Sequence, residues 1–260
     1  MTVWRETENM GLWGAFKAFE TMGLKHGMAS RLGGVSEGQL GSLNLGFLAE
    51  PDSRENVLTN RKNFLEPIGL KAENLATYRQ VHGDRIVRVN EPIHSLEEAD
   101  AVVTNVPELA LLVLAADCVP IILVDPVHRA VGVAHAGWKG TALQIAAKTV
   151  RRMKIEFGSV PEEMWVGIGP SIGHCCYEVS KDVYLEVMES LDDPQYPETI
   201  PEKPHLDLWA VNEQQLADVG VPRHQILNAK VCTRCKHDRF FSHRAGHHGR
   251  GGITAAWPSS

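Results

Sequence analysis

Three short segments of the sequence place a histidine or a cysteine beside small or turn-forming residues. They are Arg79-Gln-Val-His-Gly83, Ala116-Asp-Cys-Val-Pro120 and Ala134-His-Ala-Gly-Trp-Lys-Gly140. Two imidazoles and one thiolate, from His82, Cys118 and His135, suit Zn²⁺ or copper far better than Mg²⁺ or Ca²⁺, which prefer oxygen ligands. Three protein ligands leave a fourth tetrahedral position for water or substrate. The residue types therefore indicate a catalytic metal site, although spacing alone does not pair ligands this far apart.

The same residues allow chemistry without a metal. Cys118 could act as a nucleophile, with His82 or His135 as its base and Asp117 orienting that base. Alternatively, Cys118 is a small buried apolar residue and each histidine is structural. His82 is the first candidate for acid–base work because imidazole titrates near neutral pH, but a histidine bound to a metal does not serve both roles.

The other four cysteines form two pairs in the sequence. Cys232-Thr-Arg-Cys235 has the C-x-x-C spacing, but no second C-x-x-C pair lies at zinc-finger distance. A structural zinc involving this motif is an open alternative. Cys175 and Cys176 are expected to be an ordinary buried pair. Five cysteines are too few for a disulfide scaffold in 260 residues, so we expect reduced thiols.

Composition narrows the class of partner. The chain has 260 residues with 43% hydrophobic content and a formal net charge of -6. This acidic balance argues against binding nucleic acid or a membrane surface, since both are polyanions that select a basic face. A small-molecule substrate fits better. The charged N-terminal residues are not a signal peptide, and no segment approaches the length of a membrane span, so we expect a cytoplasmic protein.

The elements that must position the candidate ligands are strands in the middle of the chain. Continuous apolar runs predict strands buried on both faces at 111–114, 121–124, 130–134 and 164–168. Cys118 lies between two of these strands, and His135 follows a third. In an open sheet, ligands bind outside strand ends.

Helices are predicted around these strands. Apolar residues at helical spacing predict an amphipathic helix over 141–157, and further helices are expected at 181–191 and 209–219. Asp52 and Glu55 form a capping box for a helix that runs to about Leu65. The proline-rich stretch 192–204 and the glycine-rich stretch 242–252 are expected to be loops. The mixture predicts a single α/β domain over residues 1–260.

The sequence resembles the laccase-domain family, also called the polyphenol oxidase or multicopper oxidase-like family, now regarded as purine nucleoside phosphorylases with adenosine deaminase activity. The matching words span most of the chain in order. They are Ser30-Arg-Leu-Gly-Gly-Val-Ser36, Asn44-Leu-Gly46, Arg79-Gln-Val-His-Gly83, Ala99-Asp-Ala-Val-Val-Thr104, Ala116-Asp-Cys-Val-Pro-Ile121, Val133-Ala-His-Ala-Gly-Trp-Lys-Gly-Thr141, Gly169-Pro-Ser-Ile-Gly173, Cys175-Cys-Tyr-Glu178, Leu206-Asp-Leu208 and Phe241-Ser-His-Arg244.

The resemblance implies both a fold and a site. The fold is an α/β (α+β) single-domain α-β-β-α sandwich with mixed β-sheets, present as a monomer or homodimer. The histidines and cysteine of the three central words are the metal and catalytic positions, here His82, Cys118 and His135. The implied cofactor is zinc, with copper possible, and the substrates are purine nucleosides and phosphate. On motif context, Ser36, Asn44, Arg61 and Arg79 are proposed substrate or phosphate contacts. The family's second arginine after the Ser-His-Arg word is replaced here by Ala245.

Two rival activities use the same positions. Copper-dependent polyphenol oxidation of the conventional laccase type needs repeated H-x-H words, and no two histidines in this chain stand two apart. A cysteine amidohydrolase acting on cell-wall precursors would need Cys118 but no metal.

Overall fold

The computed structural model describes residues 1–7, 11–47 and 52–259. Thirteen strands within these ranges form two mixed sheets. The seven-stranded sheet has the order β1-β2-β3-β13-β8-β4-β6, with the bounds Thr2–Thr7, Gly11–Phe16, Lys25–Ala29, Gly251–Ala256, Ala110–Ala115, Leu75–Arg79 and Ile93–Glu98. Its first five strands pair antiparallel, whereas β4 runs parallel to both β8 and β6.

The six-stranded sheet has the order β12-β11-β9-β10-β7-β5. These strands are Ile226–Asn228, Trp165–Ile168, Val119–Asp125, Ala130–Ala136, Ala101–Thr104 and Ile86–Arg88. The central strands pair antiparallel, and the two edge strands β12 and β5 are parallel to their neighbours. The predicted strands at 111–114, 121–124, 130–134 and 164–168 are confirmed as β8, β9, β10 and β11, and β11 begins one residue later than predicted.

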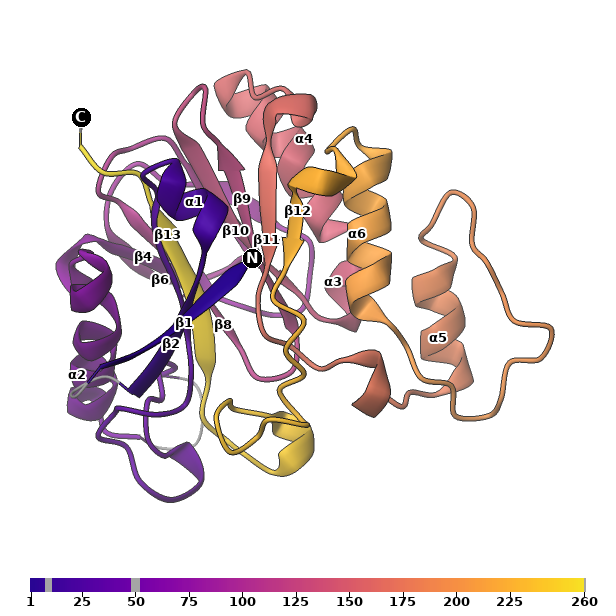
Figure 1. The fold of residues 1–260 in the computed structure, drawn as a ribbon, viewed down its shortest axis with the longest axis horizontal. Helices are drawn as coiled ribbons and strands as arrows, with labels where there is room; N and C mark the ends of the chain where they lie inside the picture. The colour runs from indigo at the N-terminus through magenta and orange to yellow at the C-terminus, as the bar shows by residue number, and fades with distance from the viewer. Residues whose placement is uncertain (8–10, 48–51, 260) are drawn as a thin grey trace.

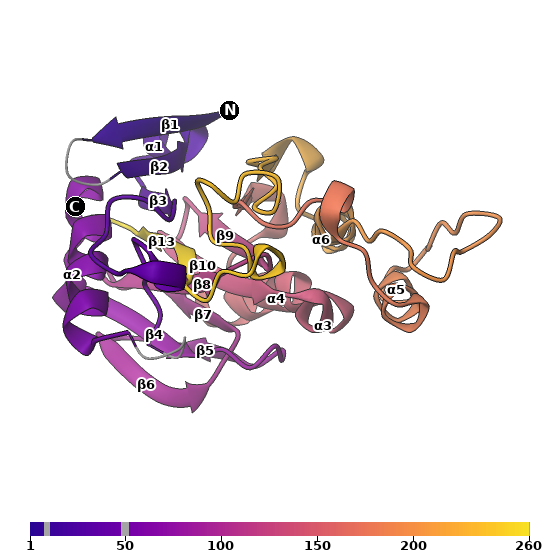
Figure 2. The same cartoon turned by 90° about the horizontal axis from the view of Figure 1, so that it is seen from below.

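Six α-helices accompany the two sheets within the described ranges. They are α1 Lys17–Thr21, α2 Arg54–Leu65, α3 Trp138–Ala142, α4 Ile145–Phe157, α5 Lys181–Met188 and α6 Leu208–Asp218. Figure 1 and Figure 2 show α2 on one side of the strands, α3, α4 and α6 on the other, and α5 beyond α6. None of the described helices is long and apolar enough to cross a bilayer.

Alternating side chains on the central strands build three apolar layers. In β8, Leu111 and Val113 point into the core between the sheets, whereas Leu112 packs outward with the α2 residues Phe64 and Leu65. The six-stranded sheet repeats this pattern, since β9 buries alternate residues between the sheets and against α4 and α6. Both faces of each central strand are therefore apolar, which explains their continuous hydrophobic runs. The expected α-β-β-α layering is confirmed.

Three local predictions need correction. The helix predicted over 141–157 is divided into α3 and α4, because Gln144 adopts a left-handed conformation with φ 58° and its side chain donates to Ser190 O. Ser53, not Asp52, caps α2 by accepting from Asn56 N–H. The glycine-rich stretch 242–252 ends in β13, where Gly252 lies so close to β8 that an added Cβ would be 2.2 Å from Val113 O.

Other predicted elements hold with small changes at their ends. The helix at 209–219 is α6, and the helix at 181–191 ends earlier, as α5. The stretch 192–204 has no helix or strand and forms the extended loop beyond α5 in Figure 1. α5 packs against α3, which begins three residues after His135.

Candidate functional site

His82, Cys118 and His135 come together at the ends of strands from both sheets. His82 lies in the loop after β4, Cys118 lies in the turn between β8 and β9, and His135 is in β10 near its end. One ligand atom from each residue lies within 4.8 Å of the other two. The sequence could not pair these residues, but the sandwich brings their three segments to one point.

The distances fit the binding of one metal ion. Cys118 Sγ is 3.8 Å from His82 Nε2, and the His82 and His135 rings lie 4.8 Å apart between centroids. A tetrahedral zinc ion with ordinary Zn–S and Zn–N bonds places its sulfur and nitrogen ligands about 3.6 Å apart. The chemistry of the donor set, one thiolate and two imidazoles, also suits a transition metal. The three side chains therefore form a candidate metal centre with a free coordination position.

Asp100, just before β7, holds two of the three ligands in place. Its carboxylate lies 2.8 Å from His135 Nδ1 and accepts backbone N–H groups from Val81, His82 and Gly83. Because a carboxylate only accepts, Nδ1 carries the proton and His135 Nε2 is left to bind an ion. Asp100 also receives the His135 backbone N–H through its carbonyl oxygen. Sequence reasoning missed this residue, although it lies within the matched word Ala99–Thr104.

Two further residues set the close packing of the centre. The side-chain amide of Gln80 bonds to the backbone of β8 as a neighbouring strand would. It donates to Leu114 O and accepts from Leu114 N–H. This fixes the His82 loop to β8. Gly137 lies against the ligands, and a Cβ atom there would be 3.0 Å from Cys118 Sγ and 3.1 Å from His82 Cδ2. A glycine at position 137 thus leaves the space that the ligand side chains occupy.

The electrostatics of the centre favour a thiolate. Burial alone would raise the pKa of Cys118, but the charge and hydrogen bonds of His135 and His82 outweigh it and lower that pKa to about 6. Burial would lower the pKa of His135, but the Cys118 thiolate and Asp100 raise it to about 9. Without an ion, the pair is a thiolate beside an imidazolium. A metal ion would take over the charge that the proton on His135 provides.

The candidate metal centre opens into a cavity of about 930 Å³. Away from the metal centre, the cavity is lined by Arg54 and Arg61 of α2. These arginines lie close to Phe47 and to His94 of β6. Apolar side chains, among them Leu112, Leu114 and Ile172, also line the cavity. A cavity of this size and mixed lining fits a drug-sized or nucleotide-sized molecule.

Arg61 is the most informative of these arginines. Its side chain is buried, its Nε donates to Leu45 O, and its guanidinium lies 4.3 Å from the centre of the Phe47 ring. Its Nη1 is buried and has no hydrogen-bond partner among the described residues. Burial and the nearby Arg54 lower the pKa of Arg61 to about 10, so it is still charged at neutral pH. A buried cation with an unsatisfied donor is suited to an anion in the cavity.

The other predicted contacts are placed differently. Arg79 lines the cavity but is exposed and forms an ion pair with Glu98. Ser36 and Asn44 are buried and both donate to the Asp52 carboxylate, and neither is among the described residues that line the cavity. Their hydrogen bonds hold the segment that leads to Phe47. A direct contact between either residue and a substrate stays a prediction.

Asp117 does not orient a histidine, as the thiol hypothesis proposed. Its carboxylate accepts from Thr233 Oγ1 at 2.6 Å and from Arg244 N–H at 2.7 Å. Asp117 has a left-handed φ of 85°, which turns the chain into Cys118. The residue that orients His135 is Asp100. Asp117 instead connects the cysteine turn to the segments around Thr233 and Arg244.

Comparison with known proteins gives relatives over most of the chain. A family model described as multi-copper polyphenol oxidoreductase laccase matches residues 25–257. A purine nucleoside phosphorylase of Bacteroides thetaiotaomicron is 34% identical over 233 residues, which cover 85% of this chain and 86% of that protein. Adenosine deaminase RL5, from an unknown prokaryotic organism, is 34% identical over 205 residues, or 74% of this chain and 78% of that protein.

A solved structure matches the whole fold. The crystal structure of YlmD from Geobacillus stearothermophilus superimposes with a TM-score of 0.89 and 31% sequence identity. The match covers 100% of both chains. The two mixed sheets and the strand ends that carry the candidate metal centre therefore belong to an architecture seen in a homologous crystal structure.

Proposed function

The chain belongs to the multi-copper polyphenol oxidoreductase laccase family, and from this we propose that it is a zinc-dependent purine nucleoside phosphorylase. Adenosine, inosine, guanosine and methylthioadenosine are the proposed nucleosides. Phosphate attacks C1′ of the ribose, the C1′–N bond of the nucleoside breaks, and the products are the free base and ribose 1-phosphate. Residues 1–260 act as one cytoplasmic domain, as a monomer or a homodimer.

One observation carries this proposal. A single cavity joins the His82–Cys118–His135 centre to the buried guanidinium of Arg61. Phosphorolysis needs a site that binds the phosphate anion and a site that withdraws electron density from the nucleoside. The two sites must lie close enough for the bound phosphate to reach the bound nucleoside. The proposed activity is also that of a relative, since the Bacteroides thetaiotaomicron protein is named a purine nucleoside phosphorylase.

The proposed roles follow from the charges of the lining. Arg61 and Arg54 bind and orient phosphate, and the unsatisfied Nη1 of Arg61 donates to a phosphate oxygen. The apolar residues of the lining cover the faces of the purine, and excluding water there favours attack by phosphate over hydrolysis. Asp100 keeps the Nδ1 proton on His135, so that the imidazole presents Nε2 to the centre.

The proposed metal is zinc, with copper as the alternative. A bound ion would supply a Lewis acid beside the departing purine or polarise a water molecule. His82, Cys118 and His135 would hold it, and Gly137 leaves room for that arrangement. An ion of this kind and the thiolate of Cys118 have complementary charge.

The experiment that tests the proposal compares inosine turnover with and without phosphate. Wild-type protein should release hypoxanthine and ribose 1-phosphate in equal amounts, and only when phosphate is present. Cys118→Ala and His135→Ala should abolish this reaction, whereas Arg151→Ala, on the exposed face of α4, should leave it unchanged. Hypoxanthine release that ignores phosphate, or that survives both site substitutions together, excludes a phosphorylase at this site.

Adenosine deamination at the same centre is a second proposed activity. The relative named adenosine deaminase RL5 supports it, as does the free coordination position left by three ligands. Water would add at C6 of adenine and ammonia would leave. Ammonia and inosine released from adenosine without phosphate would establish this activity, and its loss in His135→Ala would assign it to the same centre.

The arrangement of Cys118, His135 and Asp100 also supports a thiol mechanism. Cys118 contacts His135, and His135 contacts Asp100, in the order nucleophile, base and orienting carboxylate. This is the alternative in which the chain is a cysteine amidohydrolase. Hydrolysis of cell-wall precursor amides by metal-free protein, together with its loss in Cys118→Ala, would establish this alternative.

A further inference from the structure

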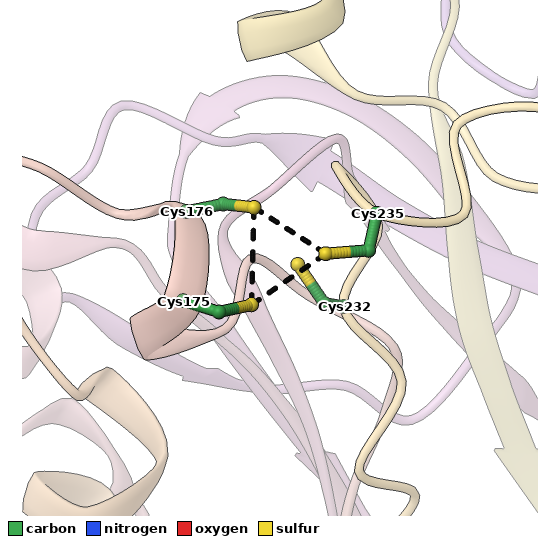
Figure 3. A group of neighbouring side chains, drawn as sticks. All are labelled: Cys175, Cys176, Cys232 and Cys235. Atoms are coloured by element: carbon green, nitrogen blue, oxygen red, sulfur yellow. Dashed lines mark hydrogen bonds between the residues drawn. The ribbon is translucent and has the colours of Figure 1, made fainter.

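Four of the five cysteines gather at a place separate from the candidate metal centre. Cys175 and Cys176 belong to the short 3₁₀ helix η5 (His174–Cys176), and Cys232 and Cys235 belong to a turn much later in the chain. Figure 3 shows the four side chains pointing toward one another from these two segments. The sequence prediction of a buried Cys175–Cys176 pair is wrong, since Cys175 is exposed and Cys176 is half-buried.

The sulfur distances correspond to ligands of one ion. Cys235 Sγ lies 3.6 Å from Cys175 Sγ and 3.4 Å from Cys176 Sγ, and the two neighbouring cysteines are 3.8 Å apart. All four sulfurs lie within 4.8 Å of one another. A tetrahedral zinc ion with four thiolates, each at about 2.3 Å, has sulfurs about 3.8 Å apart. A disulfide would join only two of the four sulfurs, at about 2.05 Å.

The backbone around the cluster is built for this approach. Gly173 N–H donates to Cys232 Sγ at 3.3 Å, which favours the thiolate form of that ligand. Gly173 is also closely packed, because a Cβ atom there would lie 3.0 Å from Trp209 Cη2, 3.3 Å from Cys232 Cβ and 3.4 Å from Cys175 Sγ. A bridge between Ser171 and Cys232 holds the two segments side by side. A glycine at this position thus lets the two cysteine segments and Trp209 approach one another closely.

We propose that Cys175, Cys176, Cys232 and Cys235 bind one Zn²⁺ as a closed structural site. Four thiolates with no open position are the arrangement of structural zinc, which has no redox chemistry and needs no further ligand. A multinuclear iron–sulfur cluster divides its four thiolates among two or four irons and holds them in a wider cage than this compact group. The exposure of Cys175 and Cys235 gives an ion access from solvent.

The proposed zinc would support one wall of the cavity. Thr233, between the two ligands of the later pair, donates to Asp117 Oδ1, and the other Asp117 oxygen accepts from Arg244 N–H. Ile172, Tyr177 and Arg244 line the cavity, and Ile172 and Tyr177 flank η5 in the chain. Holding the two cysteine segments together therefore fixes the turn that presents Cys118, without any ligand of one centre serving the other.

Metal analysis of the full chain tests the proposal. Cys118→Ala removes a ligand of the other centre and should retain one tightly bound zinc per chain. In that background, replacing the exposed pair by Cys175→Ser and Cys235→Ser should lose this zinc. X-ray absorption of the zinc in Cys118→Ala should show four sulfur neighbours at about 2.3 Å. This readout does not involve nucleosides, so it stands or falls independently of the proposed activity.

Three results would overturn the proposal. The first is a Cys118→Ala protein, purified without chelator, that holds no metal or holds iron instead. The second is zinc content unchanged by the two serine substitutions. The third is a thiol count below four in Cys118→Ala after denaturation without reductant, which would mean that the cluster is a disulfide. Because the wild-type cysteines are present in the first and third measurements, poor folding of the serine variant does not remove the test.

Discussion

Oδ1 of Asp100 lies 2.8 Å from Nδ1 of His135 while the same carboxylate accepts the backbone N–H groups of the His82 loop. One carboxylate therefore sets both the tautomer of one proposed ligand and the position of another. Hydrogen bonds from His135 and the loop overcome the effect of burial, which would raise the pKa of Asp100, and leave that pKa below its usual value. Asp100 is thus ionised wherever the protein is folded near neutral pH.

Asp100→Asn should weaken metal binding at the His82–Cys118–His135 centre by about 10- to 100-fold, because loss of a carboxylate that orients a ligand histidine has this effect in metal sites. A chelator competition measures the affinity. Asp84→Asn is the matched control, since Asp84 is half-exposed and paired with Lys148 on the surface. Equal metal affinities in the two variants would show that Asp100 does not hold the ligands in place.

Metal affinity at this centre should rise with pH. Binding displaces the proton from His135, whose pKa is raised to about 9, so affinity increases about tenfold per pH unit below that value and levels off above it. Below about pH 6 the Cys118 thiol is also protonated and the dependence becomes steeper. Zinc dissociation constants measured from pH 5.5 to 9.5 in Cys175→Ser/Cys235→Ser protein isolate this centre. An affinity independent of pH between 7 and 8.5 contradicts the assigned proton.

Arg61→Lys should raise the KM for phosphate. The substitution keeps a positive charge but loses the planar fork and the buried Nη1 donor, a charge-assisted hydrogen bond worth about 1.5–3 kcal/mol, or roughly 10- to 150-fold. Arg79→Lys should have a smaller effect, since Arg79 is exposed and already paired with Glu98. Steady-state kinetics with varied phosphate and saturating inosine give both values. A larger increase in KM for Arg79→Lys than for Arg61→Lys would assign the phosphate site to Arg79 instead.

Gly137→Ala should lose metal while the protein stays folded. The backbone at Gly137 has φ -66°, which alanine adopts without strain, but its Cβ would press on Cys118 Sγ and His82 Cδ2. Zinc content and circular dichroism separate the two effects. Gly251→Ala is the control, because a Cβ there has only ordinary contacts, the nearest at 3.5 Å. Normal zinc content in Gly137→Ala would show that the ligands have more room than these distances allow.

The central strands were predictable because their cause is local in the sequence. β8, β9 and β10 are buried on both faces, so their apolar runs are continuous and easily recognised. The break at Gln144 was not predictable, since it depends on a contact with Ser190 far along the chain. Asp52 was misassigned for a similar reason: Ser36 and Asn44 occupy its carboxylate, and Ser53 caps the helix instead.

The candidate centre shows the same division. Residue type and the family resemblance identified His82, Cys118 and His135, but nothing in their spacing indicated Asp100, which acts through contacts between separate strands. The Cys232-x-x-Cys235 spacing raised a structural zinc as an alternative, but its pairing with Cys175 and Cys176 was not predictable for the same reason. Metal motifs are recognised by short spacings, whereas Cys175 and Cys235 are brought together by contacts between distant segments, among them the bridge between Ser171 and Cys232.

The position of β13 has a consequence for how the protein is made. This strand follows all the others in the chain, yet it lies in the middle of the seven-stranded sheet, between β3 and β8. During synthesis, β1 to β3 and β8 leave the ribosome without the partner that joins them. The facing edges of β3 and β8 therefore stay unpaired until residues 251–256 join them, and unpaired edges of this kind are where a sheet pairs with other chains.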